Sequence, residues 1–225
     1  MTRRLSWDEY ATAWARVRGG YDPRLASPSV RRWLYTAYRV GSVLSRVWVR
    51  PAALSVAGVL VSVGVPILAV RHPWGPVAAA GLVTLAAMTD SVRGAVALTT
   101  GRLTRLNYVY EAFADRVTEA LWLAAFWRLG ASEAVVVVGG ALSWLHEYVR
   151  ARAVTAGMDE AISTMVGERS SRVWVAAVGL PVAGLSGLIM PELVSGTITV
   201  AAAVWLLLAM FGLGQMLAEI RRALR

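Results

Sequence analysis

The stretch TDSVRGAVALTTGRLTRLNYVYEAFADRV, residues 89–117, carries charged side chains within two otherwise apolar segments. Residues spaced three, four and seven apart lie on one face of a helix, and the spacing here predicts such a face in each segment. The short turn TTGRLTRL would join the two helices antiparallel, so we expect the two faces to meet. The first face carries Asp90, Arg93, Gly94 and Ala97, and the second carries Asn107, Glu111 and Asp115.

Charges at these positions need a physical reason, because a charged side chain at the centre of a membrane costs about 3 kcal/mol. One interpretation is an interhelical salt-bridge network, which accounts for Arg93. The other is a site for a divalent cation and a phosphate group, because clustered carboxylates bind hard cations. The residues alone leave the two interpretations equal, although three acids exceed what one arginine needs.

The composition indicates an integral membrane protein. Of the 225 residues, 57% are hydrophobic, and the mean hydropathy is +0.54, which is high for a soluble domain. Cysteine is absent, so disulfides, thiol catalysis and cysteine-based metal sites are excluded. The formal net charge is +9 and all 23 basic residues are arginines. These arginines flank apolar runs, so we expect contact with anionic membrane lipid and not with nucleic acid.

Six segments are long and apolar enough to be candidates for spanning a bilayer, which needs about 20 residues per helix. Arginines gather in alternate connections between these segments, and the positive-inside rule then places both termini in the cytoplasm. The N-terminus lacks the apolar core of a signal peptide. We therefore expect a multi-pass protein of the cytoplasmic membrane. The six segments are residues 52–70, 74–99, 106–127, 134–156, 173–190 and 193–218.

We divide the chain into a cytoplasmic N-terminal segment, residues 1–50, and a six-helix transmembrane domain, residues 51–225. The stretch SPSVRRWLYTAYRVGSVLSRVWVRP interleaves apolar residues and arginines at roughly helical spacing. This pattern predicts an amphipathic helix in the cytoplasmic interface. The stretch GGYDPRLASP before it predicts a linker. The expected fold is thus all-α, with six transmembrane helices after an interfacial N-terminal helix.

The charged stretch resembles the signature of the CDP-alcohol phosphotransferase family, D-x2-D-G-x2-A-R-x8-G-x3-D-x3-D, and the spacing holds without a gap. Four positions are identical, and Glu111 conservatively replaces the third acid. The identical positions are Asp90, Gly94, Ala97 and Asp115. Three positions depart from the signature: Arg93 stands in place of the second acid, Leu98 in place of the arginine, and Asn107 in place of the glycine.

Flanking segments extend the resemblance over most of the chain from Pro51, especially to actinobacterial members. RPAALS, which contains Ser55, is similar to the P-[ND]-x-x-T start of the family's first helix. EYVRARAVTAG and GERSSRVWV are similar to the SYxKARAxxxG and ERxxR stretches of its fourth and fifth helices. Here Glu147 stands where serine is usual. Near the C-terminus, GQMLAEIRR is loosely similar to Q-R-x-L, with Met216 where arginine is common.

The resemblance implies an enzyme of phospholipid biosynthesis that transfers a substituted phosphate from a CDP-linked lipid donor to an alcohol and releases CMP. It implies that Asp115 is the catalytic base, and it implies a homodimer. The metal ligands would be Asp90, Glu111 and Asp115; the CDP donor would contact Asp90, Gly94, Ala97 and Ser55; an acceptor phosphate would contact Arg150, Arg152, Arg169 and Arg172. Arginine suits phosphate, although the positive-inside pattern by itself accounts for much of that cluster.

Arg93 changes the charge of the expected site, because a guanidinium is permanently positive and cannot ligate a metal. Family members hold two divalent cations with four acids, and these charges sum to zero. Three acids and Arg93 sum to −2, which one divalent cation neutralises. We therefore hypothesise that Arg93 replaces the charge of one metal, so that Mg²⁺ or Mn²⁺ binds as one cation and not two, or not at all.

Two alternatives remain at this point. Three non-conservative departures from the signature fit a catalytically impaired pseudoenzyme of the same fold, which would bind lipid or nucleotide or pair with an active relative. Losing the motif arginine and glycine would also weaken CDP binding. A small transporter would account for charges within the membrane but not for the motif spacing.

Overall fold

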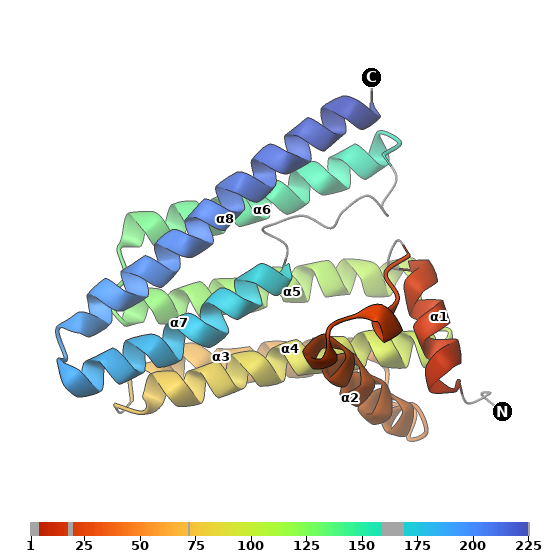
Figure 1. The fold of residues 1–225 in the computed structure, drawn as a ribbon, viewed down its shortest axis with the longest axis horizontal. Coiled ribbons are helices and arrows are strands. Elements are labelled where there is room, and N and C mark those ends of the chain that lie inside the picture. The colour runs from red at the N-terminus through yellow and green to blue at the C-terminus, as the bar shows by residue number, and fades with distance from the viewer. Residues whose placement is uncertain (1–4, 18–19, 72, 159–168, 225) are drawn as a thin grey trace. The chain divides into compact units, whose positions relative to one another are not determined.

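The protein is all-helical in the part of the chain that its structure, a computed structural model, describes: residues 5–17, 20–71, 73–158 and 169–224. This part contains eight α-helices and one short 3-10 helix, η1, and no strand (Figure 1). The elements are α1 (Trp7–Val17), η1 (Pro23–Leu25), α2 (Pro28–Leu44), α3 (Pro51–Ala69), α4 (Gly75–Thr100), α5 (Arg105–Arg128), α6 (Glu133–Thr155), α7 (Arg169–Ile189) and α8 (Leu193–Ala223).

Helices α3 to α6 match the first four predicted segments to within one residue at each end. Helix α7 begins four residues before its predicted segment, and α8 ends five residues after its own. Within the described residues, four of these helices are both long and apolar enough to cross a membrane: α3, α4, α7 and α8. Helices α5 and α6 have sufficient length, but their ionisable residues lower their hydropathy. The fold is therefore that of a multi-pass helical membrane protein, and the crossing of the membrane by α5 and α6 stays a prediction.

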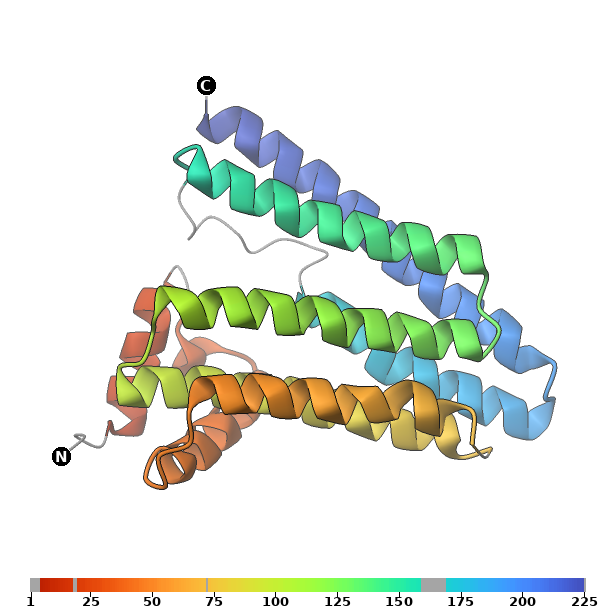
Figure 2. The same cartoon turned by 180° about the vertical axis from the view of Figure 1, so that it is seen from behind.

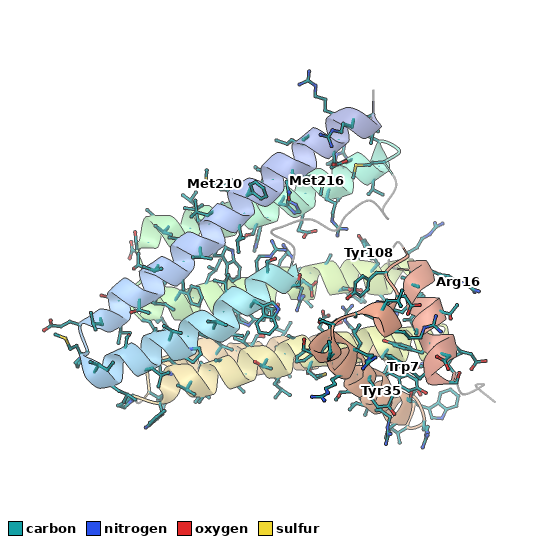
Figure 3. The ribbon with its side chains drawn as sticks, in the orientation of Figure 1. Trp7, Arg16, Tyr35, Tyr108, Met210 and Met216 are labelled. Carbon is teal, nitrogen blue, oxygen red and sulfur yellow. The ribbon has the colours of Figure 1, made fainter. Side chains whose placement is uncertain are left out.

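The amphipathic helix predicted before the first span forms as α2, and its place in the membrane interface stays a prediction. A second helix, α1, precedes it and was not predicted from the sequence. The start of α1 is a capping box, because the Ser6 N–H donates to Glu9 Oε2 at 2.7 Å and the Glu9 N–H donates to Ser6 Oγ at 3.2 Å. An aromatic cluster joins α1 to α2: the Trp7 ring lies 5.2 Å from the Tyr35 ring (Figure 3) and 5.5 Å from the Tyr38 ring.

The chain divides into two compact units. Unit 1 comprises Met1–Leu60 and Leu85–Asp115, and it includes α1, η1, α2, the first half of α3, the C-terminal part of α4 and the N-terminal part of α5. Its core holds Ala37, Val92 and Val96 together with Leu44, Leu54 and Met88. Helix α2 approaches α4 closely at Gly41, where a Cβ would lie 2.7 Å from the Ala95 Cβ. This contact fixes α2 beside the helix that carries Asp90 and Arg93.

Unit 2 comprises Val61–Thr84 and Arg116–Arg225. Within it, α8 packs against both α6 and α7, and Figures 1 and 2 show α6 and α8 side by side. A buried hydrogen bond of 3.0 Å from Trp205 Nε1 to Ser143 Oγ joins α8 to α6. Small residues allow the α7–α8 contact, because a Cβ on Gly179 would lie 2.7 Å from the Ala201 Cβ.

Candidate functional site

The Arg93 guanidinium lies between two carboxylates of the signature stretch, one on its own helix and one on α5. Its Nε is 3.1 Å from Asp90 Oδ1, and Nη2 contacts the same oxygen. Its Nη1 is 2.5 Å from Glu111 Oε2. The Arg93 side chain is 7% exposed, whereas those of Asp90 and Glu111 are 28% and 33% exposed. We call Asp90, Arg93 and Glu111 the Arg93 triad.

The predicted meeting of the two charged faces is thus confirmed for Asp90, Arg93 and Glu111, all within unit 1. Asp115 lies one helical turn beyond Glu111 on α5 and is half-buried. Across the described ranges, no group of three or more His, Asp or Glu side chains is arranged to hold a metal ion. The acids therefore do not fit the four-carboxylate cradle that two divalent cations require, because a guanidinium stands between two of them.

The residues expected on the donor side lie around the same part of unit 1. Ala97 is buried and Gly94, one residue after Arg93, is half-buried on α4. A Cβ on Gly94 would lie 3.8 Å from Trp14 Cζ3 of α1, so no close protein contact requires glycine there. Ser55 is half-buried in the first half of α3.

The two other departures from the signature are Asn107, which has a local structural role, and Leu98, which has no evident one. Asn107 Nδ2 donates to the Arg102 carbonyl at 2.9 Å, and the Asn107 N–H donates to Thr104 Oγ1 at 3.2 Å. Asn107 therefore stabilises the turn that leads into α5. Leu98 is half-buried on α4, and nothing in the structure explains why it replaces an arginine.

A second ionic cluster lies in unit 2, and its central residue, Glu119, was not predicted from the sequence. Arg172 of α7 pairs with Glu119 of α5, with Nε 3.0 Å from Oε1, and each side chain is 1% exposed. Arg116 Nη2 lies 3.1 Å from the same Glu119 oxygen. Glu119 continues the four-residue series of Asn107, Glu111 and Asp115 along α5, and this spacing was the signal that could have identified it.

Glu147 of α6 connects this cluster to the arginines expected to bind an acceptor phosphate. Its Oε1 accepts from Arg172 Nη2 at 3.3 Å, and its Oε2 accepts from Arg150 Nε at 3.1 Å. Arg116 Nη2 is 3.9 Å from Glu147 Oε1. We call Arg116, Glu119, Glu147, Arg150 and Arg172 the Arg172 cluster, and its formal charge of three arginines and two glutamates is +1.

The remaining residues of the expected acceptor side separate into two kinds. Arg152 is exposed near the end of α6, and Arg169 is half-buried as the first residue of α7. Met216, at the position where arginine is common, is fully buried on α8 (Figure 3) and packs with Ala153 and Met158. Met216 thus belongs to the apolar core of unit 2 and does not take part in the ionic cluster. The ERxxR stretch begins at Glu168, which lies outside the described residues.

Known proteins that resemble this chain, in sequence or in fold, include phosphate synthases of inositol lipids. No family model matches the chain. The archaetidylinositol phosphate synthase of Aeropyrum pernix is 26% identical over 147 residues, which cover 64% of this chain and 68% of that protein.

Two crystal structures of Mycobacterium tuberculosis phosphatidylinositol phosphate synthase have a similar fold. The structure with CDP-DAG bound has a TM-score of 0.61 and 22% identity, covering 80% of this chain and 92% of that chain. The structure in complex with manganese and citrate has a TM-score of 0.66 and 21% identity, covering 82% of this chain and 88% of that chain.

The fold and the charged helices together define a multi-pass helical membrane protein with acids of a phosphotransferase signature on α4 and α5. The chain is similar in sequence to a synthase and similar in fold to the M. tuberculosis structures, and its motif spacing resembles the signature of the CDP-alcohol phosphotransferases.

Proposed function

We propose that this protein is a membrane transferase that moves a substituted phosphate from a CDP-linked lipid donor to an alcohol and releases CMP. The observation that carries the proposal is that Asp90 and Glu111, two acids at the sequence spacing of the family signature, both contact the Arg93 guanidinium. The relative is a synthase, and the M. tuberculosis protein of similar fold binds CDP-DAG. These likenesses favour an active enzyme over a catalytically impaired relative.

In the proposed reaction, Asp115 takes the proton of the acceptor hydroxyl. The acceptor oxygen then forms a bond to the donor phosphorus that carries the lipid, and the bond from that phosphorus to the CMP oxygen breaks. Asp115 suits the role of base because the residue is only partly buried, so that a substrate hydroxyl can approach it. Most of the catalysis would come from positioning the reactants and stabilising charge on the phosphate.

On the donor side, we propose that a phosphate group approaches the α4 backbone at Gly94, where the position of the missing Cβ lies 3.8 Å from Trp14 Cζ3 and is not crowded by the protein. Asp90, Ala97 and Ser55 complete the set of residues that we propose to contact the CDP portion. Glu111 and Asp90 also hold Arg93 in place, and Arg93 brings a fixed positive charge to the acidic site. A fixed cation can stabilise negative charge that develops on a phosphate in the transition state.

On the acceptor side, we propose that Arg150, Arg152, Arg169 and Arg172 favour an alcohol that bears an anionic group. The Arg172 Nη1 atom supports this assignment, because it is buried and has no hydrogen-bond partner in the described part of the chain. Glu147 competes with such an acceptor, because it already accepts hydrogen bonds from Arg150 and Arg172.

In the membrane, we propose six crossing helices with both termini and the acidic site on the cytoplasmic side. The charges of α5 and α6 do not oppose this arrangement, because Arg116, Glu119 and Glu147 are paired inside the protein and do not face lipid alone. A homodimer is part of the proposal, and it is tested by the mass of the detergent-solubilised protein.

A divalent cation is expected for a member of this family, and the M. tuberculosis protein of similar fold is in complex with manganese. When bound, such a cation neutralises charge on the transferring phosphate. The Arg93 triad does not fit a pair of cations, so no step of the proposed reaction depends on two metals.

The experiment that tests the proposed function measures CMP release from radiolabelled CDP-diacylglycerol with a panel of polyols and polyol phosphates. We expect turnover in the wild type and its loss in Asp115→Asn, which should remain folded because Asp115 is not fully buried. Asp8→Asn is the matched control, because Asp8 is an exposed acid at the start of α1. If no acceptor supports CMP release by the wild type, the proposed function is wrong.

A further inference from the structure

The Arg93 side chain has the contacts of a bound cation. Three of its nitrogen atoms contact carboxylate oxygens: Nε and Nη2 both contact Asp90 Oδ1, and Nη1 contacts Glu111 Oε2. It is nearly inaccessible to solvent, whereas both acids remain partly exposed. A guanidinium held in this way links α4 to α5, as a metal bridging the same two carboxylates would.

A divalent cation cannot occupy the same position while Arg93 is there. Its ligand oxygens would lie about 2.0–2.6 Å away, so a cation bound to the same Asp90 and Glu111 oxygens would be within a few ångströms of the guanidinium. The two positive charges would repel each other, because the guanidinium itself is almost inaccessible to water and little solvent screens it. Arg93 also leaves the pair of acids with a formal charge of only −1, which weakens the attraction for a divalent cation.

We propose that the Arg93 guanidinium takes the place of one divalent cation between Asp90 and Glu111, so that removing it opens one additional cation site in the protein. This inference rests on the proposed function for its meaning in catalysis, but not for its test. It makes Arg93 a built-in counter-ion, which needs no metal to be bound at that position.

The test counts bound Mn²⁺ and does not depend on turnover. Protein purified in detergent and stripped of metal is titrated with MnCl₂, and the free ion is measured by its electron paramagnetic resonance signal. Arg93→Asp restores an acid at the signature position, and we expect it to bind one more Mn²⁺ per chain than the wild type does. Arg105→Asp makes the same change of charge at an exposed residue of unit 1, and its count should equal that of the wild type.

A neutral variant, Arg93→Gln, provides a second test of the inference in case Arg93→Asp does not fold. Arg93→Gln removes the positive charge without adding an acid, and we expect its Mn²⁺ affinity to exceed that of the wild type at least tenfold. Circular dichroism and size-exclusion chromatography would show which variants are folded. Equal Mn²⁺ counts in wild type and Arg93→Asp, two Mn²⁺ ions in the wild type, or unchanged affinity in Arg93→Gln would each overturn the inference. None of these outcomes depends on whether the protein releases CMP, so the two proposals can fail separately.

Discussion

Arg172 and Glu119 form an ion pair in the interior of unit 2, with the Arg172 Nε atom 3.0 Å from Glu119 Oε1 and both side chains almost completely buried. Each charge of a buried ion pair compensates the other, because a buried charge without a partner strongly destabilises the folded protein. Arg116 and Glu147 extend the pair into the Arg172 cluster. Arg172 therefore has a structural role as well as the proposed role toward the acceptor.

The first prediction concerns the stability of this pair. Glu119→Gln leaves the buried Arg172 charge poorly compensated, and we expect it to lower the free energy of unfolding by about 3–5 kcal/mol. The double variant Glu119→Leu/Arg172→Met removes both charges and should recover most of that loss. Thermal unfolding of the detergent-solubilised protein measures both effects. A double variant less stable than Glu119→Gln would contradict the assignment of a mutually compensating pair.

The second prediction concerns Glu147 and the acceptor. Glu147→Ser releases hydrogen-bond donors of Arg150 and Arg172 that now serve the Glu147 carboxylate. Since a hydrogen bond to a charged group contributes about 1.5–3 kcal/mol, we expect the KM for a phosphorylated acceptor to fall about tenfold or more. The KM for an uncharged polyol should change little. Glu219→Ser, which breaks the exposed pair of Glu219 with Arg222, is the control. Equal changes for both kinds of acceptor would argue against an anionic acceptor.

The third prediction separates packing from ligand binding at two glycines of unit 1. Gly94→Ala adds a Cβ at an ordinary contact distance of 3.8 Å from Trp14, so the protein should be as stable as the wild type, or more stable by up to about 1 kcal/mol. If Gly94 admits the donor phosphate, the KM for CDP-diacylglycerol should nevertheless rise at least tenfold. An unchanged KM would remove Gly94 from the donor side.

Gly41→Ala is the matched contrast, because its new Cβ would lie 2.7 Å from the Ala95 Cβ and 3.3 Å from the Val92 carbonyl oxygen. Overpacking of this kind costs about 1–3 kcal/mol. We expect the melting temperature to fall in Gly41→Ala and not in Gly94→Ala. The opposite order would mean that α2 does not rest against α4 as described.

The sequence predicted the elements of the fold better than the contacts between them. Mostly apolar segments of about 20 residues located α3 to α8 as helices. Of these, α3, α4, α7 and α8 have the length and hydropathy of a helix that fits a membrane. Helix α1 was missed because it is shorter than a membrane span, although Ser6 and Glu9 form a capping box at its start.

The candidate site was predicted only in part, because the sequence shows which residues share a helix face but not how the helices pack. Helical spacing brought Asp90, Arg93 and Glu111 together correctly, since periodicity determines which residues share a face. The insertion of Arg93 between the two acids depends on the distance between α4 and α5, which periodicity does not contain. The burial of Glu119 likewise depends on Arg172, which lies 53 residues further along the chain, on α7.

The last prediction concerns the membrane topology, and the absence of cysteine makes it simple to test. Single cysteines can be introduced at two exposed residues, Leu103 in the α4–α5 connection and Ser132 in the α5–α6 connection. If α5 crosses the membrane and the N-terminus is cytoplasmic, a membrane-impermeant maleimide added to intact cells should label Ser132→Cys and not Leu103→Cys. Both variants should be labelled once the membrane is permeabilised, which shows that each cysteine is reactive. Labelling of both variants in intact cells would mean that α5 does not cross the membrane, because the two ends of one crossing helix cannot face the same side. Labelling of Leu103→Cys alone would mean that α5 crosses in the direction opposite to the proposed one.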